Sequence, residues 1–125
     1  MPDMLVKLYE LPKLEPLLNS MVKQNLALRL GIPPEKHLVV NWISQNFSEK
    51  WASEADVAFA NKPSTIYLAV DNDTNKLAGF ACYEATYKGF FGPVGVHPDY
   101  RGKGIGRALL VASLHGLWNL GYAYA

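Results

Sequence analysis

Apolar residues in the first quarter of the chain predict one strand and one helix. A short apolar segment at 5–9 ends before Pro12 and predicts a first strand. Apolar residues then recur at helical spacing and predict a helix over 14–22. Gly31 follows and suits the C-terminal end of that helix, because glycine readily takes the left-handed conformation found there.

Two further apolar stripes at helical spacing lie between residues 33 and 63. Pro34 is well placed in a first helical turn. The first stripe predicts a helix with one apolar face: Val39, Trp42, Ile43 and Phe47. The second stripe belongs to another helix, or to the same helix after a kink: Trp51, Ala55, Ala58 and Phe59. The sequence at 61–63, which ends in proline, stops this helical region.

The second half of the chain has the composition of strands separated by turns. Residues 65–70 are rich in β-branched and aromatic side chains and predict a strand. The polar cluster at 71–76 predicts a turn, so 77–87 is expected to form the second strand of an antiparallel hairpin. A third strand is predicted at 90–96. A helix follows at 104–120, and 122–125 resembles the opening of another strand.

This order of elements predicts an α+β fold, an α/β three-layer arrangement with a mixed central sheet. Strands 90–96 and 122–125 are joined through a helix, so a right-handed crossover would make them parallel neighbours. The chain has 125 residues and neither repeats nor a linker. Residues 1–125 are therefore interpreted as one domain.

Composition excludes several classes of partner and cofactor. A formal net charge of +1 gives no general reason to expect nucleic acid or an anionic membrane surface as a partner. Cys82 is the only cysteine, so an internal disulfide and a zinc site of the usual multi-cysteine kind are excluded, and no metal is expected. The N-terminal residues show no basic region followed by an apolar run, so no signal peptide is expected. No apolar run is long enough for a membrane span. A cytoplasmic protein is expected.

The chemical signal of the chain is the glycine-rich turn that precedes the last helix. Gly102, Gly104 and Gly106 alternate with Arg101, Lys103 and Ile105, and Arg107 follows. Free N–H groups at a helix start carry the positive end of the helix dipole, and glycines let the backbone approach a ligand closely. The pattern therefore predicts a diphosphate site. It is not a Walker A loop, because Gly104 stands where Ser or Thr is needed, and it lacks the last glycine of a dinucleotide fingerprint.

The residues before the glycine-rich turn make the predicted ligand more specific. The run Val94-Gly95-Val96-His97-Pro98-Asp99-Tyr100-Arg101-Gly102-Lys103-Gly104-Ile105-Gly106 resembles the acetyl-CoA signature of the GCN5-related N-acetyltransferase (GNAT) family. That family's pattern, Gln/Arg-x-x-Gly-x-Gly/Ala, is matched by Arg101, Gly104 and Gly106. The strong match covers roughly residues 90–122, and the upstream order of elements agrees with the family.

The resemblance implies a GNAT-like acyl-CoA N-acyltransferase fold with acetyl-CoA as acyl donor. Backbone amides from Gly102 to Arg107 would hold the diphosphate. Backbone groups of Val94 and Val96 would pair with the pantetheine arm, and an amide of this strand, which includes Gly95, would polarise the thioester carbonyl. An amine would attack directly, with no covalent enzyme intermediate.

Gly92-Pro93 bears on the same strand. A proline inside a strand removes a hydrogen-bond donor and usually marks a bulge or an edge. Such an interruption would free N–H and C=O groups for pantetheine. The alternative is a proline that simply starts the strand.

Proton transfer from the amine needs an acid or base near strand 90–96. Glu84 would share a strand face with Phe80 and Cys82, where burial could raise its pKa. Glu54 lies one helical turn beyond Trp51, in helices that line the acceptor site in the resembling family. For each of the two, the alternative is an ordinary structural or exposed carboxylate. Weaker candidates are Tyr83, Tyr87 and His97, whereas Cys82 is interpreted as a core residue.

The family normally continues beyond the position that corresponds to residue 125, with the rest of a fifth strand, a helix and two more strands. The resemblance therefore implies a domain truncated at the start of its fifth strand, with the C-terminal strands and helix missing. The helix at 105–120 is apolar on most of its circumference and needs cover on most sides. A longer enzyme is the favoured explanation, and a homodimer that covers the open sheet edge is the second.

Three functions remain open from the sequence. The leading one is an acetyl-CoA-dependent N-acetyltransferase that moves an acetyl group to a primary amine in a ternary complex. The second is a CoA-binding module without turnover, and the third is a protein that binds a different phosphate ligand. The acceptor, a small-molecule or peptide amine, is not specified by any residue pattern.

Overall fold

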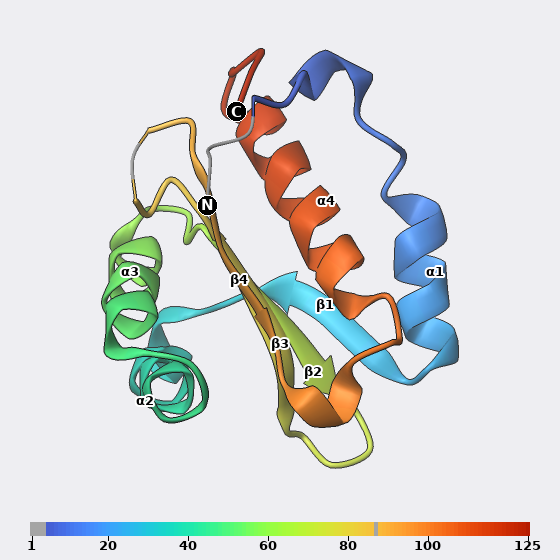
Figure 1. Ribbon diagram of the computed structural model, residues 1–125, viewed down its shortest axis with the longest axis vertical. Coiled ribbons are helices and arrows are strands. Elements are labelled where there is room, and N and C mark those ends of the chain that lie inside the picture. The colour runs from blue at the N-terminus through green and yellow to red at the C-terminus, as the bar shows by residue number, and fades with distance from the viewer. Residues whose placement is uncertain (1–4, 87) are drawn as a thin grey trace.

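The computed structural model describes residues 5–86 and 88–125 (Figure 1). Its elements follow in the order η1 (Leu8–Glu10), α1 (Glu15–Lys23), β1 (Leu26–Leu30), η2 (Pro33–Glu35), α2 (Lys36–Asn46), α3 (Glu49–Ala60), β2 (Ile66–Asp71), β3 (Leu77–Tyr83), β4 (Phe91–Val96), η3 (Pro98–Tyr100) and α4 (Ile105–Asn119). The predicted helices at 14–22 and 104–120 and the three-strand meander are confirmed. The helical region at 33–63 is two helices, separated at Phe47 and Ser48.

The central sheet has the order β1-β2-β3-β4, and every neighbouring pair is antiparallel. The predicted parallel pairing of 122–125 with the 90–96 strand is wrong, so the described sheet is antiparallel and not mixed. Residues 122–125 instead meet the N-terminal segment through an antiparallel bridge between Lys7 and Tyr124. The physical reason lies at Gly121, whose φ of 100° turns the chain directly after α4.

The elements form three layers, as the α+β three-layer prediction requires. Figure 1 shows the sheet nearly edge-on, with α2 and α3 on one face and α1 and α4 on the other. One buried cluster joins α2 and α3 to the sheet through residues such as Ile43, Phe59 and Phe80. Two further clusters fill the opposite face around α4, centred on Leu109 and on Leu117.

Two predictions near the N-terminus are corrected. The segment 5–9 is not a strand: Lys7 forms a single bridge to Tyr124, and the short helix η1 begins at Leu8. The first helix ends at Lys23, and β1 follows it after a turn at Asn25, whose φ is 59°. Within β1 three leucines alternate with Ala27 and Arg29, a period of two that identifies a strand.

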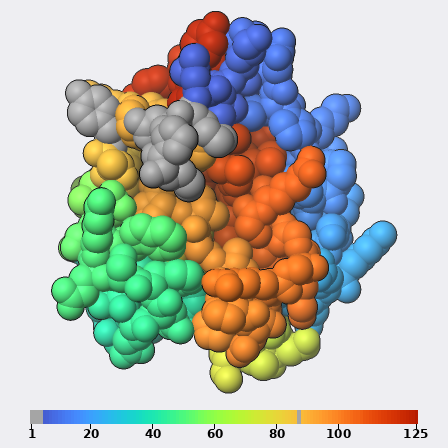
Figure 2. All heavy atoms as spheres, in the orientation of Figure 1, coloured from blue at the N-terminus to red at the C-terminus, as the bar shows by residue number. Residues whose placement is uncertain are grey.

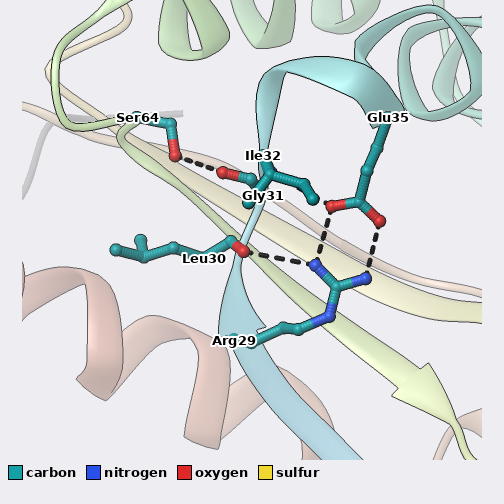
Figure 3. Close-up of polar contacts among 6 residues, drawn as sticks. All are labelled: Arg29, Leu30, Gly31, Ile32, Glu35 and Ser64. Atoms are coloured by element: carbon teal, nitrogen blue, oxygen red, sulfur yellow. Dashed lines mark hydrogen bonds and ion pairs between the residues drawn. The ribbon is translucent and has the colours of Figure 1, made fainter.

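Gly31 therefore follows a strand, not a helix. A methyl group there would lie 2.8 Å from Cε1 of Phe59, so close packing explains the glycine. Figure 3 shows how the connection to α2 is held: Ser64 donates to the carbonyl oxygen of Gly31, and the Arg29 guanidinium binds both carboxylate oxygens of Glu35 at 2.7 and 2.6 Å. These contacts fix the position of α2 relative to the sheet.

The apolar circumference of α4 is largely covered within the described chain. Between residues 105 and 117 only Arg107 is exposed. The sheet covers one side of the helix, and α1 and η1 contact others. Trp118 and Leu120 are 46% and 50% exposed and extend beyond this cover. The N-terminal segment thus supplies cover that the sequence pattern did not reveal.

Candidate functional site

The glycine-rich turn joins β4 to α4 through η3. Gly102 and Gly104 have φ of 81° and 79°, a left-handed conformation that side chains with a Cβ rarely adopt. Gly104 is the N-cap of α4, and no side chain caps the helix start. A methyl group at Gly102 or Gly104 would meet no atom within 4 Å, so this backbone faces open space. The first N–H groups of α4 are thus accessible to an anion.

Two contacts from distant parts of the sequence hold the turn in place. The Gln24 side chain, just after α1, donates to the Lys103 carbonyl oxygen at 3.0 Å. The Tyr100 hydroxyl donates to the Asp71 carboxylate at 2.7 Å. This bond raises the pKa of Tyr100 and lowers that of Asp71. Neither contact was predicted, because nothing in the local sequence pairs these residues.

Positive charge is concentrated around the turn. Arg101, Lys103 and Arg107 are all exposed, and none of them forms an ion pair with another residue of the described ranges. The Lys103 ammonium lies 5.5 Å from the centroid of the Tyr100 ring. A diphosphate at the start of α4 would therefore meet backbone donors and unpaired cations together.

Strand β4 lies at the edge of the sheet and carries a bulge. Ala81 pairs with Val94 and Tyr83 with Phe91, so Cys82 alone stands opposite Gly92 and Pro93. Two residues opposite one is the arrangement of a β-bulge. The interpretation of Gly92-Pro93 as an interruption at an edge is thus confirmed. In the described chain no strand pairs with the outer side of β4.

The hydrogen bonds of β4 fix the direction of its backbone groups. The His97 N–H donates inward to the Ala78 carbonyl oxygen at 2.8 Å. Because backbone groups alternate in direction along a strand, those of Val96 and Val94 point outward, away from β3. The two residues predicted to pair with pantetheine therefore present their N–H and C=O groups on the open edge, on the path that ends at the glycine-rich turn.

Gly95 points to the face covered by α2 and α3. A methyl group there would lie 2.8 Å from Cζ of Phe47 and 2.9 Å from Cε1 of Phe80. Phe47 also packs against Trp51 at a centroid distance of 5.5 Å, and Trp51 against Phe80 at 6.0 Å. On this side Phe47 thus packs over Gly95 of β4, and Trp51 packs over Phe80 of β3.

Glu84 does not continue the buried face of β3. The strand ends at Tyr83, and Glu84 has a φ of 59°, so the expected alternation with Phe80 and Cys82 is broken. Its carboxylate accepts the Gly89 N–H at 2.6 Å and a hydrogen bond from the Tyr122 hydroxyl that raises the pKa of Tyr122. These contacts tie the β3–β4 loop to the segment after α4. Its catalytic role stays a prediction.

Glu54 lies on α3, where it faces the β3–β4 loop. Its carboxylate accepts the Thr86 hydroxyl at 2.8 Å. The side chain is half-buried and forms no ion pair within the described ranges. Burial, and secondarily the negative charge of Glu54, raise the pKa of the Cys82 thiol.

The remaining residues considered for a catalytic role differ in their environments. Cys82 is buried in the core, as predicted. Burial, followed by Tyr67 and Glu84, raises the pKa of Tyr83 to about 12. His97 stacks on Trp42 and lines a hollow of about 520 Å³ on the α2 side of the sheet. Tyr87 lies outside the described residues.

The described ranges contain neither a cluster of metal-ligating side chains nor a membrane-spanning helix. No group of three or more His, Cys, Asp or Glu side chains there is placed to hold a metal ion. No helix in those ranges has both the length and the apolar character needed to cross a membrane.

Together, the four-stranded antiparallel sheet, its helical layers and the β4–turn–α4 unit define an acyl-CoA N-acyltransferase fold. The chain belongs to the GNAT family: the model of the Acetyltransferase (GNAT) family matches residues 36–124. The resemblance of the 94–106 run to that family is thereby confirmed. No curated protein sequence matches the chain.

Solved structures support the same fold. The chain is similar to a fungal multi-domain GH3 beta-N-acetylglucosaminidase that contains a GCN5-related glucosamine N-acetyltransferase region, with a TM-score of 0.72 and 18% identity over 99% of this chain. It is also similar to a GCN5-related N-acetyltransferase from Sphaerobacter thermophilus, with a TM-score of 0.64 and 24% identity over 81% of this chain. The matches cover 18% and 34% of the lengths of those two chains.

Proposed function

We propose that this protein is an acetyl-CoA-dependent N-acetyltransferase that moves an acetyl group to a primary amine by direct attack in a ternary complex. The supporting observation is that the open edge of β4 leads directly to the glycine-rich start of α4. The outward backbone groups of Val94 and Val96 lead along the edge of β4 to the open, cationic helix start at Gly104. In the view of Figure 2, the central column of β4 lies between the α2–α3 layer and α4.

The residues of the glycine-rich turn suit the diphosphate of acetyl-CoA. The glycines at 102 and 104 leave the first amides of α4 accessible, and Arg101, Lys103 and Arg107 add charge that a diphosphate would neutralise. Gly106 lies where a methyl group would come within 3.5 Å of Val96 Cγ2, so the helix start and the end of β4 pack closely. When bound, acetyl-CoA supplies an activated acetyl thioester.

The strand and the helices have different tasks in the proposed reaction. An outward N–H of β4 donates to the thioester carbonyl oxygen and stabilises the negative charge that develops there during attack. The acceptor approaches from the α3 side, over Phe47 and Trp51. Glu84 and Glu54 stay the candidates for proton transfer. The Glu54 carboxylate accepts one hydrogen bond, from Thr86, whereas the Glu84 carboxylate accepts hydrogen bonds from Gly89 and Tyr122.

Calorimetry with acetyl-CoA and with ATP tests the donor site, and thiol release with a panel of primary amines tests turnover. We expect saturable binding of acetyl-CoA, weaker or no binding of ATP, and amine-dependent release of CoA. Acetyl-CoA binding without thiol release for any amine would favour the CoA-binding module. Equal affinity for ATP would favour a protein that binds a different phosphate ligand.

A further inference from the structure

Glu84 connects several segments of the fold at the point where β3 ends. Its N–H donates to the Phe90 carbonyl oxygen at 2.9 Å and closes the β3–β4 loop. Its carbonyl oxygen accepts the side-chain amide of Asn61, at the end of α3, at 3.4 Å. Its carboxylate accepts the Gly89 N–H at 2.6 Å. The φ of 59° at Glu84 is a conformation that a residue with a Cβ keeps only when its surroundings hold it.

Gly89 is held from two sides. It is buried and has a φ of 75°, and a methyl group there would lie 3.5 Å from Cε1 of Tyr122. The Tyr122 ring therefore packs against this part of the loop, and its hydroxyl donates to the Glu84 carboxylate. The carboxylate thus joins the loop to the segment that follows α4.

The β3–β4 loop, residues 84–90, leads directly into the part of β4 that carries the bulge. Phe91 is the first residue of β4 to pair with β3, and the bulge at 92–93 follows it. Because backbone groups alternate in direction along a strand, a shift of the register by one residue would turn the N–H and C=O groups of Val94 and Val96 toward β3. The hydrogen bonds that close the loop therefore decide which groups of β4 are open to a donor.

Two tasks for the Glu84 carboxylate make different demands on its chemistry. A base must take a proton from the amine, whereas a group that holds the loop needs only an oxygen that accepts the Gly89 N–H. Resting on the proposed function, we propose that Glu84 is a positioning residue that, through the Gly89 N–H, fixes the register in which β4 offers its edge to the donor. Proton transfer then belongs to another group.

Two substitutions of Glu84 separate these tasks. Glutamine keeps an accepting oxygen but is no base, and alanine removes the oxygen. Calorimetry with acetyl-CoA and thiol release with the amine panel are measured for the wild type, both variants and Lys88→Ala, an exposed change in the same loop. Glu84→Gln should keep acetyl-CoA affinity and kcat within about threefold, because a neutral hydrogen bond replaces a charge-assisted one. Glu84→Ala should weaken acetyl-CoA binding about tenfold, and Lys88→Ala should not.

Three outcomes would overturn the assignment. Loss of turnover in Glu84→Gln with normal acetyl-CoA binding would make Glu84 the proton-transfer group. Unchanged affinity in a folded Glu84→Ala protein would show that the loop does not position the donor edge. Equal losses of affinity in the glutamine and alanine variants would show that the accepting oxygen is not what matters. If Glu84→Ala does not fold, Glu84→Asp, whose shorter side chain draws the oxygen away from Gly89, replaces it with the same expectation.

Amide exchange measured by NMR distinguishes failure of this assignment from failure of the proposed function. A wild type that binds no acetyl-CoA would count against the proposed function, yet the register of β4 can still be measured. The His97 N–H donates inward to Ala78, and Gly95, two residues earlier, also points inward. Both amides should stay protected in the wild type, Glu84→Gln and Lys88→Ala, and should exchange about tenfold faster in Glu84→Ala. Equal protection in all four proteins would overturn the assignment.

Discussion

The side-chain amide nitrogen of Gln24 lies 3.0 Å from the carbonyl oxygen of Lys103, although 79 residues separate them in sequence. This contact links the end of α1 to the turn that precedes α4. A donor site made of backbone amides depends on the position of the main chain and not on particular side chains. The residues that hold the turn are therefore as important as the glycines within it.

Replacement of Gln24 by alanine should weaken acetyl-CoA binding about fivefold. One hydrogen bond of this kind contributes about 1 kcal/mol, and its loss lets the turn sample other conformations. Calorimetry provides the measurement, and Asn19→Ala, an exposed change within α1, is the matched control. An unchanged dissociation constant in Gln24→Ala would mean that the turn keeps its shape without α1.

Two replacements of Gly104 should separate the effect of backbone strain from the effect of a side chain in front of the α4 amides. Gly104→Val places a β-branched residue at φ 79°, which costs about 1–2 kcal/mol of stability and should abolish donor binding. Gly104→Asn tolerates the left-handed conformation better, so its unfolding should be close to that of the wild type. Its side chain would still occupy the space in front of the α4 amides.

Urea unfolding and acetyl-CoA titration of both Gly104 variants check this prediction. Gly121→Asn serves as the control, since it changes another left-handed glycine far from the turn. Normal acetyl-CoA affinity in a folded Gly104→Asn protein would show that the diphosphate does not bind at this helix start.

Gly95→Ala should destabilise the fold by about 1–3 kcal/mol, the usual cost of overpacking. The added methyl group would lie 2.8 Å from Phe47 and 2.9 Å from Phe80. A second change, Phe47→Leu, removes the nearer ring and should recover part of the loss. A double-mutant cycle by urea unfolding measures this coupling. Simple additivity of the two changes would argue against direct contact between Gly95 and Phe47.

The Arg29–Glu35 ion pair should contribute to stability at neutral pH and not in acid. The hydrogen bond from Arg29 holds the pKa of Glu35 below its ordinary value of 4.5. A depressed carboxylate pKa stabilises the folded state above the unfolded-state pKa, and this stabilisation is lost as the pH falls through the folded-state pKa. With 43% and 23% of the side chains exposed, we expect about 0.5 kcal/mol.

Glu35→Gln tests the ion pair. Its unfolding free energy should be lower than that of the wild type at pH 7, and the difference should shrink as the pH falls below about 4. Asp73→Asn, an exposed carboxylate in the β2–β3 turn, is measured alongside. A difference that persists unchanged in acid would assign the effect to packing and not to charge.

The sequence predicted those parts of the fold whose signals are local. The β-branched and aromatic side chains of Thr65–Val70, the turn cluster after them and the glycines at 102–106 each favour one local conformation. β1 was missed because its leucines follow a helix in which leucines also recur. The pairing of 122–125 was predicted wrongly because the conformation of Gly121, and not the general crossover rule, decides where that segment runs.

The parts of the candidate site made of backbone groups, the glycine-rich turn and β4, could be predicted from the sequence. The side-chain contacts between distant segments could not. Glu84 was placed on a buried face by alternation, yet its left-handed conformation ends the strand one residue earlier. The contacts of Gln24 with Lys103 and of Tyr100 with Asp71 join segments that carry no common pattern. Such contacts depend on the packed structure as a whole.

The open edge of β4 has a consequence for the protein without its donor. Unpaired N–H and C=O groups on an edge strand are a template onto which the strand of another molecule can add. A pantetheine arm and a neighbouring chain would therefore compete for the same backbone groups of Val94 and Val96. If acetyl-CoA binds as proposed, it would also reduce self-association, because each occupied molecule would have one fewer open strand edge among the described residues.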